Sequence, residues 1–116
     1  MIEARWTPTQ AEFDAFAALS GDDNPIHTDP AHAARTRFGR TVSHGMLIFA
    51  RFEALIAAHW PALRITAHEM IFPNPAYAGE ELVLRVCAEG GTLILRATRA
   101  ADGAACFEGR ATHDSG

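Results

Sequence analysis

The chain has 116 residues, 48% of them hydrophobic and 21% charged, with a formal net charge of −4 at neutral pH. This composition is typical of a folded domain with a buried core, and it excludes an intrinsically disordered chain. An acidic chain also lacks the broad basic surface that binds nucleic acid or an anionic membrane, so we expect neither as a partner.

All ten basic residues are arginine. Without lysine, the protein has no Schiff-base chemistry and no phosphate-binding P-loop. The two cysteines, Cys87 and Cys106, lack metal-ligand spacing, and the N-terminus lacks an apolar signal region, so we expect two buried thiols in a cytoplasmic protein. No stretch approaches the roughly 20 apolar residues that span a bilayer. No repeat or linker divides the chain, and we expect a single domain over residues 1–116.

The N-terminal third predicts a short strand followed by two helices. The strand is expected from Ile2 to Trp6. The sequence Thr7-Pro8-Thr9-Gln10 is typical of a capping box with proline at the first helical position, and Ser20-Gly21 is typical of a helix end. Asp29-Pro30 predicts another N-cap, followed by a short helix through about Arg35.

A longer helix is expected from about Gly45 to Trp60, where Pro61 closes it. Its only charged side chains before His59 are Arg51 and Glu53, which leaves most of its circumference apolar. Such a helix belongs in the interior of the protein.

The remaining chain has the two-residue period of β-strands. Four strands are expected over residues 65–72, 81–88, 92–100 and 104–112. Gly90-Gly91 and Asp102-Gly103 predict tight hairpins, so the last three strands should be neighbours. The alternation gives this sheet one apolar face, which only the central helix is long enough to cover. The predicted fold class is therefore α+β, with one curved antiparallel sheet wrapped around the central helix.

The turn Ser20-Gly21-Asp22-Asp23-Asn24-Pro25-Ile26-His27 contains the first candidate chemistry. Pro25 restricts both itself and the preceding residue, so the turn should be stiff. In such a turn Asp22 and His27 could converge and hold a water, as a carboxylate and an imidazole that transfer protons near neutral pH. The alternative is an Asx turn in which the polar side chains bond to the backbone and His27 lies on the surface.

A metal site is a further alternative for this turn. Five residues have ligand side chains, namely Asp22, Asn24, His27, Asp29 and His32. Their spacing matches neither an EF-hand loop nor a His-Glu-x-x-His helix, so we expect no metal.

The residues Ser43-His44-Gly45 at the start of the central helix form the second candidate. The first N–H groups of a helix lack intrahelical acceptors and carry the positive end of its dipole. Because Gly45 has no side chain, a substrate oxygen can approach its N–H, as in an oxyanion hole. Ser43 could act as the N-cap, and His44 could pack or cap.

These motifs together resemble those of the MaoC-like dehydratases, the (R)-specific enoyl-CoA hydratase or hydratase 2 group. The matching motifs are the turn within 16–27, Asp29-Pro30 with Ala33, His44-Gly45-Met46, Phe72-Pro73-Asn74-Pro75 and Gly79-Glu80-Glu81-Leu82. The ordered pair of turn and helix start is more specific than either motif alone.

The resemblance implies a hotdog fold and a homodimer whose sheets join edge to edge. It implies that Asp22 and His27 hold the catalytic water, that the Gly45 N–H binds the thioester oxygen, and that Asn24 shapes the turn. The implied reaction is reversible hydration of a trans-2-enoyl thioester to an (R)-3-hydroxyacyl thioester. It needs no cofactor, since CoA or an acyl carrier protein is part of the substrate.

We expect six residues of the turn and the central helix to contact the substrate, namely Asn24, Ser43, His44, Met46, Phe49 and Glu53. The acyl chain is expected near Met46, Phe49 or Glu53. Glu53 would limit the chain length or select a polar acyl group. Two alternatives remain, a hotdog thioesterase that uses the same helix end and a non-catalytic acyl-thioester binding subunit.

Overall fold

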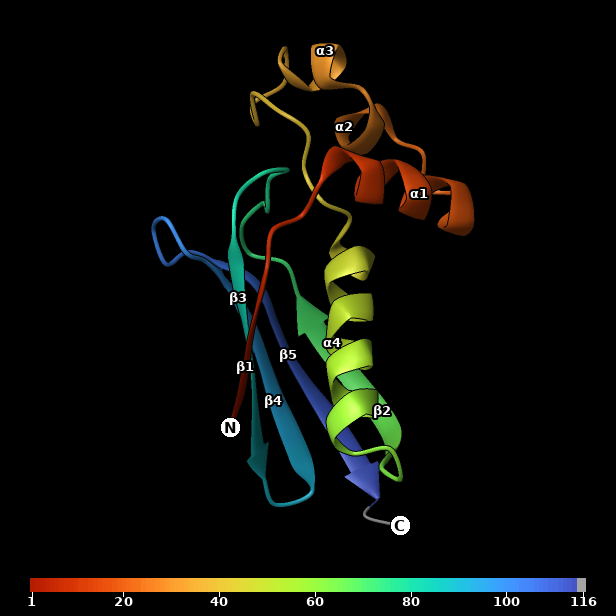
Figure 1. Ribbon diagram of the computed structural model, residues 1–116, viewed down its shortest axis with the longest axis vertical. Coiled ribbons are helices and arrows are strands. Elements are labelled where there is room, and N and C mark those ends of the chain that lie inside the picture. The colour runs from red at the N-terminus through yellow and green to blue at the C-terminus, as the bar shows by residue number, and fades with distance from the viewer. Residues whose placement is uncertain (115–116) are drawn as a thin grey trace.

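The computed structural model describes residues 1–114 and shows a curved sheet with one long helix against it and three short helices at one end (Figure 1). The strands are β1 (Ile2–Trp6), β2 (Arg64–Ile71), β3 (Leu82–Glu89), β4 (Thr92–Arg99) and β5 (Ala105–Asp114). The helices are α1 (Gln10–Ser20), α2 (Pro25–Thr28), α3 (Pro30–Ala33) and α4 (Gly45–His59). The predicted strands and the predicted central helix are confirmed, with some ends shifted by one or two residues.

The five strands form one antiparallel sheet in the order β1-β3-β4-β5-β2. The last three strands are neighbours, as the glycine turns predict. The register pairs Leu84 with Ala97 and Val86 with Leu95, and all four side chains are buried. The predicted apolar face is therefore confirmed, and β1 and β2 are left as the two edges of the sheet.

Helix α4 lies across the apolar face (Figure 1). Its Phe52 ring lies 4.9 Å from the ring of Phe107 on β5, and neither side chain has any exposed surface. Burial of such aromatic pairs is a large part of the energy of a small core. This arrangement confirms the α+β hotdog fold. Within residues 1–114, no helix combines the length and apolarity needed to cross a bilayer.

The capping box of α1 lies two residues later than predicted. Its N-cap is Thr9, whose Oγ1 accepts from the Glu12 N–H at 3.2 Å while Glu12 Oε1 accepts from the Thr9 N–H at 3.1 Å. The Trp6 indole also donates to Glu12, at 3.1 Å. This tertiary bond favours the later of two overlapping capping patterns, and the prediction that placed the cap at Thr7 is wrong.

The helix predicted through about Arg35 ends at Ala33. The N–H groups of Arg35 and Thr36 donate to carbonyls three residues back, which is a tighter geometry than that of an α-helix. The Thr36 hydroxyl donates to the Ala33 carbonyl at 2.7 Å and accepts from the Phe38 N–H at 3.2 Å. These side-chain bonds compete with the helical pattern and stop it.

Candidate active site

The segment between α1 and α2 is a turn that helix caps hold at both ends. Gly21, at a φ of 81°, takes the left-handed conformation that glycine allows, and its N–H donates to the Ala17 carbonyl at 2.9 Å. At the other end, Asn24 Oδ1 accepts from the Ile26 N–H at 3.1 Å and caps α2. The side-chain oxygen of Asn24 is therefore used within the turn itself.

His27 and Asp22 converge at this turn. His27 is only 8% exposed, and its Nδ1 lies 2.7 Å from the Val42 carbonyl oxygen. Because a carbonyl can only accept, Nδ1 carries the proton of the neutral ring and Nε2 carries the lone pair. Nε2 lies 3.8 Å from Asp22 Oδ2, which is beyond a direct hydrogen bond but suited to one bridging water. The alternative is therefore wrong about a surface position for His27, although the Asx-type bond that it expected is present at Asn24.

His44 lies directly against this pair. Its ring stacks on the His27 ring with 3.9 Å between centroids and 23° between planes. Its Nε2 lies 2.8 Å from the backbone carbonyl oxygen of Asp22, so Nε2 carries the proton and donates. His44 is 2% exposed, and burial is the main cause that lowers its pKa below the ordinary value. The ring therefore stays neutral near neutral pH.

Gly45 and His27 line the same cavity, of about 250 Å³. Gly45 is the first residue of α4, where an N–H has no intrahelical acceptor. No side chain caps this helix start within the described residues. The Leu47 N–H donates to the His44 carbonyl at 3.2 Å, whereas the Gly45 N–H has no acceptor among these residues and is available to a ligand. Phe72 also lines the cavity and packs directly over Gly45, so that its ring atoms would come within 2.6 Å of a Cβ placed on Gly45. The structure thus places the His27 imidazole and the first residue of a helix on one cavity, and it places the Asp22 carboxylate 3.8 Å from that imidazole.

A model of the family described as the MaoC like domain matches residues 2–103. The chain belongs to this family. The match spans the turn, the start of α4 and four of the five strands, and it includes every residue that lines the cavity except Cys106 of β5.

Known MaoC-like proteins resemble this chain in sequence and in structure. The (R)-specific enoyl-CoA hydratase of Aeromonas caviae is 41% identical over 78 residues, 66% of this chain and 58% of the relative. A mitochondrial 3-hydroxyacyl-[acyl-carrier-protein] dehydratase of Arabidopsis thaliana is 35% identical over 72 residues, 62% of this chain and 43% of the relative. The solved structure of the (R)-hydratase from A. caviae superposes with a TM-score of 0.86 at 34% identity, covering 97% of this chain and 92% of that one. In sequence, the chain spans about half the length of the curated relatives it matches.

Ser43 lines the cavity but does not cap α4. Its hydroxyl donates to the His44 carbonyl at 2.9 Å, and its N–H donates to the Ala76 carbonyl at 2.8 Å. The N-cap position belongs to His44, whose side chain makes no capping bond. The prediction of a Ser43 cap is therefore wrong, and of the two alternatives for His44, packing is confirmed.

The three predicted acyl-chain residues lie elsewhere on α4 and do not line this cavity. Met46 is 50% exposed. Phe49 meets the ring of His68 on β2 edge to face at 4.7 Å, and Glu53 pairs with His68 Nε2 at 3.1 Å. Glu53 is thus partnered and exposed, so it carries no cost of an unpaired buried charge.

Sequence reasoning missed the far wall of the cavity. This wall includes Cys106 of β5, whose Sγ lies 3.4 Å from the Pro75 carbonyl oxygen. Burial raises the pKa of the Cys106 thiol to about 11, so the group stays protonated and serves as a small apolar surface. Cys106 is buried as predicted, whereas Cys87 is half-buried, and both are free. The motif Phe72-Pro73-Asn74-Pro75 could have indicated this wall, because all four of its residues line the cavity.

The predicted ligand-type residues of the turn do not gather around one point. Asp29 Oδ1 accepts from the N–H groups of Ala31 and His32, which commits it to capping α3. A different trio, Asp22, His27 and His44, has ligand atoms within 4.8 Å of one another. The two rings of this trio are stacked nearly parallel, so their in-plane lone pairs do not converge on a common ion. This geometry suits a bridging water better than a metal.

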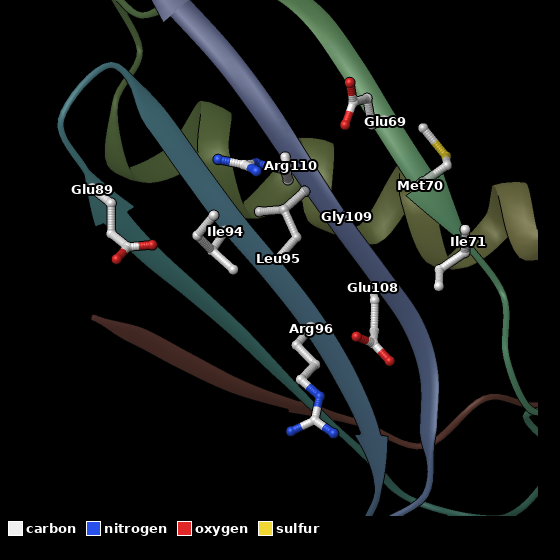
Figure 2. A pocket seen from close by; sticks show the side chains of 10 residues that line it. All are labelled: Glu69, Met70, Ile71, Glu89, Ile94, Leu95, Arg96, Glu108, Gly109 and Arg110. Carbon is white, nitrogen blue, oxygen red and sulfur yellow. The ribbon is translucent and has the colours of Figure 1, made fainter.

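A second hollow, of about 490 Å³, lies on the opposite face of the sheet, with α4 behind the strands (Figure 2). Cross-strand register places Arg110 opposite Glu69 and Arg96 opposite Glu108 on this face. Opposite charges at facing positions balance each other, as on a solvated sheet surface. The hollow is remote from the histidine pair, and we assign no chemistry to it.

Proposed function

We propose that this chain catalyses the reversible addition of water to trans-2-enoyl thioesters, which forms (R)-3-hydroxyacyl thioesters. The observation that carries this proposal is the 3.8 Å approach of Asp22 to the lone-pair nitrogen of His27, beside a cavity that Gly45 also lines. The names of the relatives, an (R)-specific enoyl-CoA hydratase and a 3-hydroxyacyl-[acyl-carrier-protein] dehydratase, support the same reaction in its two directions.

Asp22 and His27 share the proton transfers in this proposal. A water between them donates one hydrogen bond to the carboxylate and one to His27 Nε2, because both atoms are acceptors. Loss of a water proton to the pair frees the oxygen to bond to C3. The C2=C3 electrons move toward the thioester carbonyl, and the pair returns a proton to C2.

The Gly45 N–H stabilises the negative charge that the thioester oxygen gains in the enolate. A donor fixed at a helix N-terminus needs no reorganisation as this charge develops. The reaction changes no oxidation state, and each step uses only these groups. We therefore propose that no cofactor or metal is required, with CoA or an acyl carrier protein entering as part of the substrate.

The acyl chain is proposed to extend along α4 toward Met46 and Phe49. Both side chains keep exposed surface on the side of the helix near β2. The Glu53–His68 pair lies further along the same side and would place a polar limit on the chain. Asn24 and Ser43 would lie near the thioester end, whereas His44, expected from the sequence to contact substrate, is 2% exposed and would act from behind His27.

The test is to add crotonyl-CoA and to follow the absorbance of the conjugated thioester. We expect the absorbance to fall as 3-hydroxybutyryl-CoA forms, and an (R)-specific dehydrogenase assay to detect the product. A protein that leaves crotonyl-CoA and longer enoyl thioesters unchanged would contradict the proposal. Thiol release on a coloured disulfide reagent would indicate the thioesterase instead, and binding without turnover would indicate the non-catalytic subunit.

We also propose that the protein forms a homodimer through the edge of β2. An edge strand presents unpaired backbone groups, and a second copy can pair with them about a two-fold axis. Ile71 and Phe72, at the end of β2, are 59% and 46% exposed. Such apolar exposure beside the cavity mouth is typical of a surface that a partner covers.

Ile71→Arg is expected to convert the dimer to a monomer. Two-fold symmetry brings two guanidinium groups into the same apolar seam, where their charges repel and lose hydration. Size-exclusion chromatography with light scattering measures the mass. The matched control is Leu19→Arg on α1, since Leu19 is 84% exposed and lies away from β2. A dimer that survives Ile71→Arg and dissociates with Leu19→Arg would place the interface on α1 instead.

We propose a cytoplasmic location. The support is that both cysteines are free thiols, one of them buried in the core, where a reducing compartment suits them. Neither nucleic acid nor a membrane is part of the proposed function. Fractionation of cells that produce the protein is the direct measurement.

A further inference from the structure

We propose that His44 is a positioning residue that holds the Asp22–His27 pair at a set distance from the Gly45 N–H. This inference rests on the proposed function, since it identifies His44 as the residue that holds the proton-transferring groups and the oxyanion donor in fixed relative positions. His44 itself touches no reacting atom in this scheme.

The first contact joins His44 to the exposed turn. The imidazole Nε2–H donates to the Asp22 carbonyl oxygen at 2.8 Å, although the two residues lie 22 positions apart. Asp22 is solvent-exposed, and its own N–H bonds only locally, to Ser20 Oγ at 3.2 Å. The bond from His44 therefore ties the backbone of the carboxylate-bearing residue to a fully buried group.

The second contact fixes the plane of the His27 ring. His44 stacks on His27 at 3.9 Å, and the ring of Phe16 from α1 meets His44 edge to face at 4.9 Å. His27 is thus held by the Val42 carbonyl through Nδ1 and by His44 through its face. These two restraints direct His27 Nε2 toward Asp22.

The third link is covalent. His44 is bonded to Gly45 and occupies the N-cap position of α4, where Ser, Thr, Asp or Asn would usually cap the helix with their side chains. His44 makes no such bond, and its ring points to the turn instead. One residue therefore connects the oxyanion donor, through its backbone, with both members of the acid–base pair, through its side chain.

The neutral state of His44 supports this role. Burial lowers the pKa of His44 and so favours the neutral ring, and the hydrogen bond to the Asp22 carbonyl places the single ring proton on Nε2. Nδ1 is buried and has no hydrogen-bond partner within the described residues. An unsatisfied buried nitrogen destabilises the folded protein, and an apolar side chain would fill the same space without that cost. The presence of histidine therefore favours a role for its Nε2–H bond to Asp22.

The experiment compares His44→Leu with His44→Gln. Leucine fills similar volume without a donor, whereas the glutamine amide retains an N–H that can reach the Asp22 carbonyl. For His44→Leu we expect kcat to fall by about 10- to 10²-fold, the loss that a displacement of about 1 Å produces, with KM within about twofold of the parent. For His44→Gln we expect kcat within about fivefold of the parent. The thermal midpoints of both variants show whether they fold.

Backbone amide hydrogen exchange over residues 22–27 supplies a second readout that needs no activity. We expect faster exchange in His44→Leu, and exchange close to that of the parent in His44→Gln. Parental kcat and parental exchange in His44→Leu, or equal losses in both variants, would overturn the positioning role. A parent protein that is inactive on all enoyl thioesters would contradict the proposed function alone, and hydrogen exchange would still decide the role of His44.

Discussion

Asp22→Asn and His27→Asn are each expected to lower kcat/KM for crotonyl-CoA by about 10²- to 10⁴-fold, the usual contribution of general acid–base catalysis. Asparagine at position 22 keeps the shape of the side chain but is a much weaker base. Asparagine at position 27 can keep an N–H donor toward the Val42 carbonyl, while it removes the lone-pair nitrogen that faces Asp22. The absorbance assay with crotonyl-CoA measures both losses.

The matched control is Asp23→Asn. Asp23 is the neighbouring acid in the same exposed turn, and it forms no ion pair within the described residues. The change removes the same charge from the same loop, so we expect activity within about twofold of the parent. Equal losses from Asp22→Asn and Asp23→Asn would show that only the overall charge of the turn matters, and the water-activating pair would then be wrong.

Gly45→Ala is expected to lower kcat/KM by about 10²-fold, comparable to the loss of one oxyanion donor. The added Cβ would lie 2.6 Å from the ring of Phe72, so the ring must move and the opening above the N–H becomes obstructed. The fold should tolerate the change, because Phe72 is 46% exposed and alanine favours a helix over glycine by about 1 kcal/mol. Steady-state kinetics measures the loss of activity, and thermal denaturation shows whether the stability of the fold changes.

Two further variants identify the cause of that loss. The double change Gly45→Ala with Phe72→Ala removes the clash but leaves the methyl group beside the N–H. If activity stays low, the methyl group itself blocks the thioester oxygen, as the proposal requires. Gly91→Ala in the β3–β4 hairpin is the control, because the nearest atom to its Cβ is 3.9 Å away. Full activity in Gly45→Ala would exclude this N–H as the oxyanion donor.

The sheet and the central helix were predictable because their signals are local. Alternating apolar residues in β3 and β4 and the glycine hairpins specify which strands pair, whatever surrounds them. The start of α1 was predicted wrongly, since two capping patterns overlap at Thr7 and Thr9. The bond from Trp6 to Glu12 selects the second pattern, and no local rule contains that contact.

The candidate site also has a part that was predictable from the sequence and a part that was not. The spacing of Asp22 and His27 within one short, proline-stiffened turn already placed a carboxylate near an imidazole. The tautomer of His27 and the position of the Asp22 backbone depend on distant residues. Val42, 15 positions from His27, sets the tautomer, and His44, 22 positions from Asp22, holds the backbone.

Neighbours within a few residues were enough to predict the β3–β4–β5 meander, the central helix, the stiff turn and the glycine at the head of α4, whereas the hotdog fold was expected from the family resemblance. Packing between distant segments set three further features: His27 is buried with its Nε2 3.8 Å from Asp22, His44 packs against the turn instead of capping α4, and Phe72 covers Gly45. The physical reason is that a buried polar group must find its partner in three dimensions, wherever along the chain that partner lies.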